Sequence, residues 1–215
     1  VRLRDFSETS HNELQSALNT LRDEGMERLI LDLRDNPGGP LDQAIKVSNE
    51  FLPSGEMIVY TRGRVANSDQ DYHARAHSEF TEIPLIVLMN RSSASASEIV
   101  AGALQDHRRA IVMGTRSFGK GSVQTIIPLA GHGAIRLTTA HYYTPSGRSI
   151  QATGITPDII VKQARIEPVE QAQYAGGAGP DRDHHHHAEQ PCLPPHARRQ
   201  FQQAAKGQDD DGGNR

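Results

Sequence analysis

The strongest constraint on the fold is the alternation of short apolar runs with segments of helical spacing. The runs are too short for helices and almost wholly aliphatic, which is typical of strands buried on both faces; they lie at 29–33, 84–89 and 110–114. The segments of helical spacing lie at 10–25, 44–51 and 94–105. Strands that alternate with helices favour a parallel sheet with helices on its faces, so we predict an α/β fold.

The second half of the chain has a different rhythm. Strand-like segments occur at 57–60, 123–128, 134–143 and 159–161, and the later ones, joined by short glycine turns, are predicted to be antiparallel. The polar stretch from 64 to 82 is expected to form a long loop or an irregular helix. Ser10 and Glu13 are spaced as a capping box at the start of the first helix, and Gly25 is expected to end that helix.

The chain is predicted to consist of one domain and a tail. From Gln163 onward, apolar periodicity disappears, and alanine, glutamine, glycine, aspartate and proline dominate. Such a segment buries too little apolar surface to offset the entropy lost on ordering. We therefore expect a folded core over residues 1–162 and a disordered low-complexity tail over 163–215. A tail of this kind also explains why only 36% of the 215 residues are hydrophobic.

Charge and composition exclude several classes of function. The formal net charge is -3, with 23 basic and 26 acidic residues, so the chain lacks the basic footprint of a nucleic-acid-binding protein. The single cysteine, Cys192, excludes an internal disulfide framework and a cysteine-based zinc cluster. No apolar stretch reaches the roughly 18 residues that a membrane span needs. The chain begins at Val1 within a strand-like segment, so we interpret it as a fragment truncated at its N-terminus.

Three loops carry residues suited to nucleophilic catalysis: Asp32–Gly39, Ser92–Glu98 and Ser117–Gln124. Loops at the carboxyl ends of parallel strands line the sites of α/β sheets. A serine between a strand and a helix sits at the positive end of the helix dipole, and the amide that follows it can stabilise an oxyanion. Serine needs a base, and a buried lysine can supply one. Lys120, between two glycines, is the candidate for such a buried lysine.

Each of these loops taken alone also has a structural explanation. A run of small residues with serines is typical of tight helix packing, Gly-Lys-Gly of a surface turn, and Asn-Pro-Gly-Gly of a turn. The Gly-Lys-Gly segment lacks the spacing of a phosphate-binding P-loop. His107 and His141 would be the partners in a Ser–His enzyme, but we expect His107 to be a solvated helix cap and His141 to be an ordinary strand residue. The four histidines at 184–187 are interpreted as part of a solvated tail.

Together, the three loops resemble the C-terminal processing peptidases, also called tail-specific proteases. The resemblance rests on Leu31-Asp32-Leu33-Arg34-Asp35-Asn36-Pro37-Gly38-Gly39, on the segment from Ser93 to Ile99, and on Phe118-Gly119-Lys120-Gly121-Ser122-Val123-Gln124. Further matches are the segments 101–106, 137–140, 142–148 and 154–158. It extends over about three quarters of the chain, to Val161. The resemblance implies a core similar to those of ClpP and crotonase, with a mostly parallel sheet flanked by helices and later antiparallel strands.

The resemblance also implies a Ser–Lys serine endopeptidase. Ser95 matches the family's nucleophile, Lys120 its general base and Gln124 the residue that orients the lysine, while the amides of Gly39 and Ala96 match its oxyanion hole. Peptide-bond cleavage would proceed through an acyl-enzyme on Ser95, which water then hydrolyses. Neither a metal nor an organic cofactor is implied.

Substrates and cellular location follow from the same resemblance. Enzymes of this family cut proteins near apolar C-terminal tails, in the bacterial periplasm or cell envelope or in the chloroplast lumen. They form homo-oligomers in many cases, and a membrane-associated full-length protein is compatible with the resemblance. They usually carry a PDZ domain before the catalytic core, and no PDZ-like segment is recognisable in this chain.

Two other classes of function compete with the peptidase. One is a non-catalytic binding or scaffold relative, or an inactive fragment, of the same fold. Neither would need Ser95, Lys120 and Gln124 together, so their joint presence favours the enzyme. The other is a crotonase-like hydrolase or hydratase, which would need a basic cluster for the phosphates of an acyl-CoA, and the sequence shows none.

Overall fold

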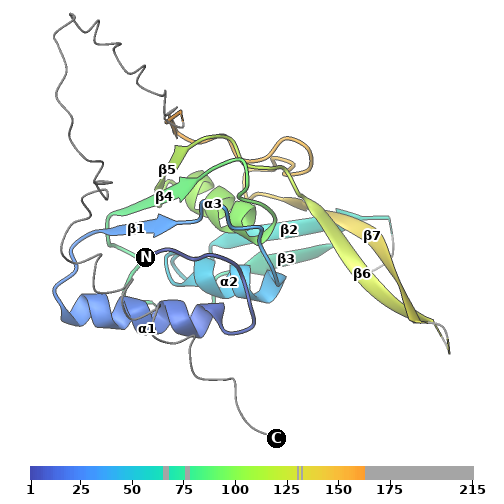
Figure 1. Cartoon of the computed structure of the whole chain (residues 1–215), viewed down its shortest axis with the longest axis horizontal. Coiled ribbons are helices and arrows are strands. Elements are labelled where there is room, and N and C mark those ends of the chain that lie inside the picture. Colours follow the sequence, from blue (N-terminus) through green and yellow to red (C-terminus); the bar gives the residue numbers. More distant parts are fainter. Residues whose placement is uncertain (65–67, 76–77, 130, 132, 163–215) are drawn as a thin grey trace, which may run out of the picture. The chain divides into compact units, whose positions relative to one another are not determined.

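Residues 1–64, 68–75, 78–129, 131 and 133–162 are described in a computed structural model (Figure 1). The three helices in this part of the chain are α1 (Ser10–Asp23), α2 (Leu41–Asn49) and α3 (Ala96–Asp106). None of the helices in these ranges is long and apolar enough to cross a membrane. The predicted disordered tail, residues 163–215, lies outside the described residues.

The first sheet is parallel, as predicted from the alternation of strands and helices. Its strand order is β1-β4-β5-β8, formed by β1 (Leu29–Asp32), β4 (Leu85–Met89), β5 (Ile111–Gly114) and β8 (Ile159–Ile160). Leu31 pairs with Val87, and Val87 pairs with Val112, so three apolar residues lie side by side across the centre of the sheet. All three are completely buried. The last strand, β8, pairs in parallel with β5, so the prediction that it is antiparallel is wrong.

The second sheet is antiparallel, with the strand order β3-β2-β7-β6. It is formed by β2 (Met57–Gly63), β3 (Gln70–His73), β6 (Ser122–Leu129) and β7 (Gly133–Tyr143). The strand β3 lies inside the polar stretch that was predicted to be a loop or an irregular helix. It was missed because its residues, Gln-Asp-Tyr-His, carry no apolar alternation and its order depends on pairing with β2. The rings of Tyr60 and Tyr143 stack across β2 and β7 at a centroid distance of 5.2 Å.

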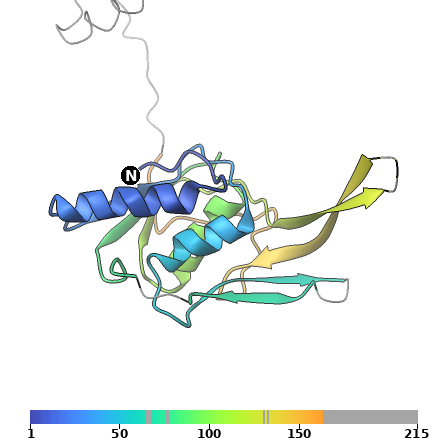
Figure 2. The ribbon, with the colours of Figure 1, turned by 90° about the horizontal axis from the view of Figure 1, so that it is seen from below.

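Helix α3 packs against strands of both sheets. It contacts β5 of the parallel sheet, β2 of the antiparallel sheet and the neighbouring helix α2 (Figure 2). Every residue from Ala96 to Leu104 is buried, and small side chains permit this close packing. A Cβ on Gly102 would lie 2.9 Å from Cγ2 of Thr144. The structural explanation of the small-residue run is therefore correct for most of this helix.

The first helix begins as predicted but is capped differently. Its N-cap is Thr9, whose hydroxyl donates to Glu13, while Oγ of Ser10 accepts the N–H of Ser7 at 2.8 Å. The predicted Ser10–Glu13 capping box is therefore wrong: Ser10 lies inside the helix, and the Thr9 hydroxyl bonds to the Glu13 side chain instead of capping a backbone N–H. Gly25 ends the helix with φ +89°, a conformation that favours glycine, and its N–H donates to Arg22.

Candidate active site

The three predicted loops follow β1, β4 and β5, so they leave the parallel sheet at the same edge. The first two are joined by Asn36, which is fully buried. Its backbone oxygen accepts the N–H of Ala94 at 3.0 Å and the hydroxyl of Ser97 at 3.1 Å. Its side-chain oxygen accepts the N–H of Gly38 at 2.8 Å. One asparagine thus fixes the glycine loop against the serine turn.

Gly38 has to be glycine because the serine turn lies directly against it. Its φ is +91°, and a Cβ at this position would lie 2.7 Å from Cβ of Ser95 and 2.8 Å from the amide nitrogen of Ala96. These contacts place the backbone of residues 38 and 39 next to the start of α3. The next residue, Gly39, is packed against the backbone of Phe6, whose oxygen a Cβ would meet at 1.8 Å.

Ser95 has a backbone conformation that serine rarely adopts. Its φ is 55° and its ψ is -113°, at the N-cap of α3. Such strain in a non-glycine residue is concentrated at functional sites, and a sharp strand-to-helix turn is how other hydrolases expose a nucleophilic serine. Ser95 is partly exposed, whereas Ser93 and Ser97 are fully buried and donate to the backbone oxygens of Leu33 and Asn36. Geometry therefore singles out Ser95 from its buried neighbours.

The two amides predicted for the oxyanion hole are available. Within the described ranges, neither the N–H of Gly39 nor that of Ala96 has a hydrogen-bond acceptor. Ala96 is the first residue of α3, where backbone N–H groups have no partner inside the helix. Gly38 and Ser95, the residues that precede these two amides, lie against each other, so the two amides belong to neighbouring segments of the packed loops.

The third loop is joined to the serine turn by Glu98, a residue whose role the sequence analysis missed. Its side chain is fully buried, and its carboxylate accepts four hydrogen bonds. One oxygen accepts the hydroxyl of Ser117 at 2.6 Å and the N–H of Gly119 at 2.7 Å. The other accepts the N–H groups of Ser95 and Lys120, both at 2.8 Å. The available signal was the Ser-x-x-Glu spacing from Ser95 to Glu98, which is that of a capping box.

The side chains of Lys120 and Gln124 are less tightly placed than the loop backbone. Lys120 lies in the loop that precedes β6, and Gln124 is the third residue of that strand. Both are exposed, and within the described structure no hydrogen bond joins them to each other or to Ser95. The prediction of a buried Lys120 is therefore wrong for this chain, because the loop holds its backbone against Glu98 but does not enclose its side chain.

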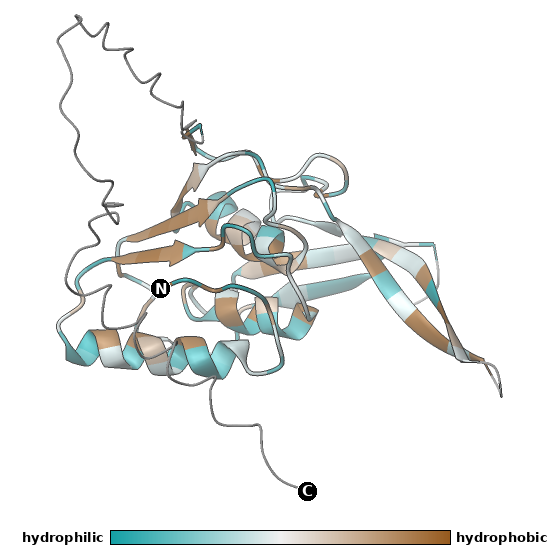
Figure 3. Cartoon of the chain, in the orientation of Figure 1, coloured by the Kyte–Doolittle hydropathy of each residue, from teal (hydrophilic) through white to brown (hydrophobic). Residues whose placement is uncertain are grey.

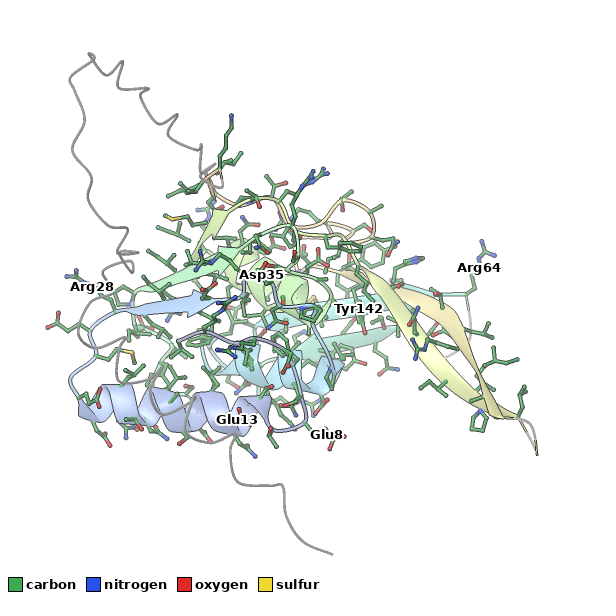
Figure 4. The ribbon with its side chains drawn as sticks, in the orientation of Figure 1. Glu8, Glu13, Arg28, Asp35, Arg64 and Tyr142 are labelled. Carbon is green, nitrogen blue, oxygen red and sulfur yellow. The ribbon has the colours of Figure 1, made fainter. Side chains whose placement is uncertain are left out.

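The charged pair at the start of the first loop is set by local hydrogen bonds. Asp32 accepts the backbone N–H of Arg34 at 3.0 Å and two N–H groups of the guanidinium of the same residue, Nε at 2.8 Å and Nη2 at 2.7 Å. These bonds hold the pKa of Asp32 below its usual range, against the opposing effect of burial. Asp35, which follows, accepts the side-chain amide of Asn90 and thereby ties the first loop to the end of β4 (Figure 4).

A comparison with protein families decides the identity of this arrangement. The sequence of residues 1–161 matches the model of peptidase family S41. The chain belongs to peptidase family S41.

Two curated relatives illustrate the similarity of the S41 chain. It is 53% identical over 188 residues to a carboxy-terminal-processing protease of Bartonella bacilliformis, and 41% identical over 170 residues to a carboxyl-terminal-processing protease of Synechocystis. These alignments cover 86% and 79% of this chain but only 43% and 39% of the relatives. The chain thus spans less than half the length of either protein.

A solved structure shows the same architecture. The photosystem II D1 C-terminal processing protease superimposes with a TM-score of 0.69 at 34% sequence identity. The superposition covers 75% of this chain and 41% of that protein. The mixed fold, with one parallel and one antiparallel sheet, is therefore that of an S41 peptidase, and the predicted fold class is confirmed.

The histidines considered for a Ser–His enzyme have other partners in this S41 core. Nε2 of His107 lies 2.6 Å from the backbone oxygen of Met57, and Nδ1 lies 3.0 Å from the carboxylate of Glu56. His107 caps α3 as predicted, but it is bonded rather than simply solvated. His141 lies within β7 opposite Arg62 and Ser122. A cavity of about 800 Å³ between α1, α2 and β3 is lined by none of the predicted catalytic residues.

Proposed function

We propose that this chain is the catalytic core of a serine endopeptidase that cleaves proteins near their C-terminal tails. The observation that carries the proposal is the Glu98 carboxylate, which binds the backbone of Ser95 and of Lys120 at the same time. An S41 chain that served only as a scaffold would not need these two backbones held to one buried group. The names of the relatives, which are carboxyl-terminal-processing proteases, support the class of reaction.

The proposed reaction begins at the strained serine. Oγ of Ser95 attacks the carbonyl carbon of the scissile peptide bond, and its proton passes to Nζ of Lys120. The carbonyl oxygen becomes an oxyanion, which the amides of Gly39 and Ala96 stabilise. The leaving amine takes the proton from Lys120 as the peptide bond breaks, which leaves an acyl-enzyme. Water, deprotonated by the same lysine, then releases the acyl group and restores Ser95.

The exposed position of Lys120 adds a requirement to this mechanism. A lysine acts as a base near neutral pH only where it is shielded from water. Because the chain spans less than half of its relatives, we infer that the bound substrate or the remainder of the protein shields this amine. Gln124, four residues farther along the chain, would then orient the shielded lysine.

The substrates, location and assembly of the protein follow from the family. Bacterial and chloroplast processing proteases are among the relatives, which supports protein substrates and a periplasmic or cell-envelope location. A preference for apolar C-termini is consistent with Phe118, which is 67% exposed two residues before Lys120. Homo-oligomer formation and membrane association stay predictions from the family.

Two pairs of matched variants test the proposal. The chain is incubated with an unfolded protein that has an apolar C-terminus, and its fragments are identified by mass spectrometry. We expect Ser95→Ala and Lys120→Ala to abolish cleavage, whereas Ser92→Ala and Lys46→Ala, which alter an exposed serine and an exposed lysine elsewhere, leave it unchanged. Full cleavage by the Ser95→Ala variant would refute the assignment of the nucleophile. No cleavage by the parent chain would show that the substrate alone does not shield Lys120, so that the remainder of the protein would be needed for the proposed activity.

A further inference from the structure

Strand β6 forms an open edge of the antiparallel sheet. One side of it pairs with β7 along its whole length, from Ser122 to Leu129. No described strand pairs with its other side, since β6 is the last strand in the order β3-β2-β7-β6. The β6–β7 ribbon extends away from the helices, so this edge is accessible (Figure 1).

The edge carries little of the protection usual for such strands: a bulge lies near its start, between Val123 and Gln124, and a proline near its end. Native edge strands carry charged residues, are very short, or are covered. The eight residues of β6, Ser-Val-Gln-Thr-Ile-Ile-Pro-Leu, include no charged residue. Ile126 is 64% exposed, and every residue from Gln124 to Leu129 is exposed. Pro128 interrupts the row of backbone donors only near the tip of the ribbon.

One face of the same ribbon is apolar. The register pairs Ile127 with Ile135 and Thr125 with Leu137, so these side chains share a face with Leu129. Figure 3 shows the hydrophobic bands along both strands. A two-stranded ribbon with exposed apolar side chains is marginally stable by itself, which indicates that a further strand or surface covers it when the protein acts.

This edge is continuous with the proposed active site. Lys120 lies two residues before β6, and its N–H is fixed by Glu98. At a rise of about 3.3 Å per residue, the eight residues of β6 extend about 26 Å from the catalytic loop. A polypeptide added to this edge would therefore reach Lys120 and Ser95 at one end.

We propose that β6 is the docking strand for the polypeptide substrate. An extended segment of the substrate, on one side of the scissile bond, pairs with the free edge of β6 through backbone hydrogen bonds. Such pairing accepts many sequences because it uses the main chain, while the exposed isoleucines favour apolar segments. This inference rests on the proposed peptidase function and adds the path by which the substrate reaches the site.

Hydrogen exchange on the inactive Ser95→Ala chain tests the docking directly, without turnover. The probe is an apolar peptide of about ten residues, long enough to span the edge. We expect the peptide to slow exchange of amides in Ser122–Leu129. Methylating alternate backbone nitrogens of the peptide should weaken binding about fivefold for each hydrogen bond removed, whereas methylating the intervening ones should not.

Three results would overturn the docking strand. The first is protection confined to residues 93–97 and 117–121, which would place the peptide at the catalytic loops alone. The second is protection of β6 without peptide that increases with protein concentration, which would identify a second copy of the chain as the occupant. The third is the absence of binding at millimolar peptide.

A pair of variants separates this inference from the proposed function. Ile126→Lys places a charge on the edge, and Ile111→Lys places one on β5, where the residue is 48% exposed. We expect Ile126→Lys to raise the KM for a long peptide about tenfold. Ile126→Lys should not change the hydrolysis of a short activated ester, because such an ester cannot reach β6. Ile111→Lys should change neither the KM for the long peptide nor the hydrolysis of the ester. Equal KM values for the two lysine variants would refute the docking strand without bearing on the peptidase activity. The nucleophile is tested separately by ester hydrolysis, which Ser95→Ala should abolish.

Discussion

Replacing Glu98 by glutamine should cost far more than its small change in shape suggests. The glutamine keeps the volume of the side chain but replaces one acceptor oxygen by an NH2 donor. If the new NH2 group faces Ser117 and Gly119, the hydroxyl of Ser117 can rotate and accept a hydrogen bond from it, but the N–H of Gly119 loses its acceptor. In the opposite orientation, the N–H groups of Ser95 and Lys120 both face a donor. The first orientation should therefore be adopted.

The magnitude follows from these bonds. One buried N–H left unsatisfied costs about 1–3 kcal/mol, and the three remaining bonds change from charge-assisted to neutral, which weakens each by about 1 kcal/mol. Removing a buried charge offsets part of this loss. We expect a net decrease of about 2–4 kcal/mol in the free energy of unfolding for Glu98→Gln. Glu98→Ala leaves all four donors without the carboxylate and should cost more than about 4 kcal/mol, a large part of the 5–15 kcal/mol typical of a domain.

Urea unfolding of the parent, Glu98→Gln and the control Glu8→Gln measures these differences. Glu8 is exposed and lies just before α1 (Figure 4), so its variant should stay within about 0.5 kcal/mol of the parent. The catalytic effect is measured in the absence of urea, where the glutamine variant is still folded. We expect its turnover to fall because the loops of Ser95 and Lys120 are no longer held together. A Glu98→Gln variant as stable and as active as the parent would refute the role of this carboxylate.

Three further predictions concern packing and titration. Gly39→Ala should destabilise the fold by more than about 3 kcal/mol, because its Cβ would meet the Phe6 oxygen at 1.8 Å; thermal unfolding measures this, and an unchanged melting temperature would contradict the contact. The lowered pKa of Asp32 means that its bonds to Arg34 stabilise the fold above the unfolded pKa of about 3.9, and that this stability is lost as the pH falls through the folded pKa. Asp32→Asn should therefore show a weaker acid dependence in urea unfolding than the parent, and identical curves would refute this. Burial raises the pKa of Tyr142 to about 12 (Figure 4). The contribution of Tyr142 to the stability of the fold should thus be complete below the unfolded pKa of about 10 and lost as the pH rises toward 12. Tyr142→Phe should therefore lose less stability at alkaline pH than the parent. Unfolding measured together with phenolate absorbance over this pH range tests this.

Most secondary structure could be predicted from local patterns. Aliphatic runs identified β1, β4 and β5 within one or two residues, and helical spacing identified α1 to α3. The errors occur where order depends on a distant partner. The strand β3 is polar and exists because β2 pairs with it, and β8 has two residues that align in parallel with β5. No local pattern contains that information.

For the candidate site, the sequence by itself determined which residue types meet and in which loops. Aliphatic strands impose a parallel sheet, and a parallel sheet brings the loops of Gly39, Ser95 and Lys120 to one edge. Only the tertiary structure decided how these loops are joined, because Asn36 and Glu98 bond to segments up to 61 and 22 residues away. It also decided that the Lys120 side chain is exposed, since burial depends on what lies over the loop rather than on the residues within it.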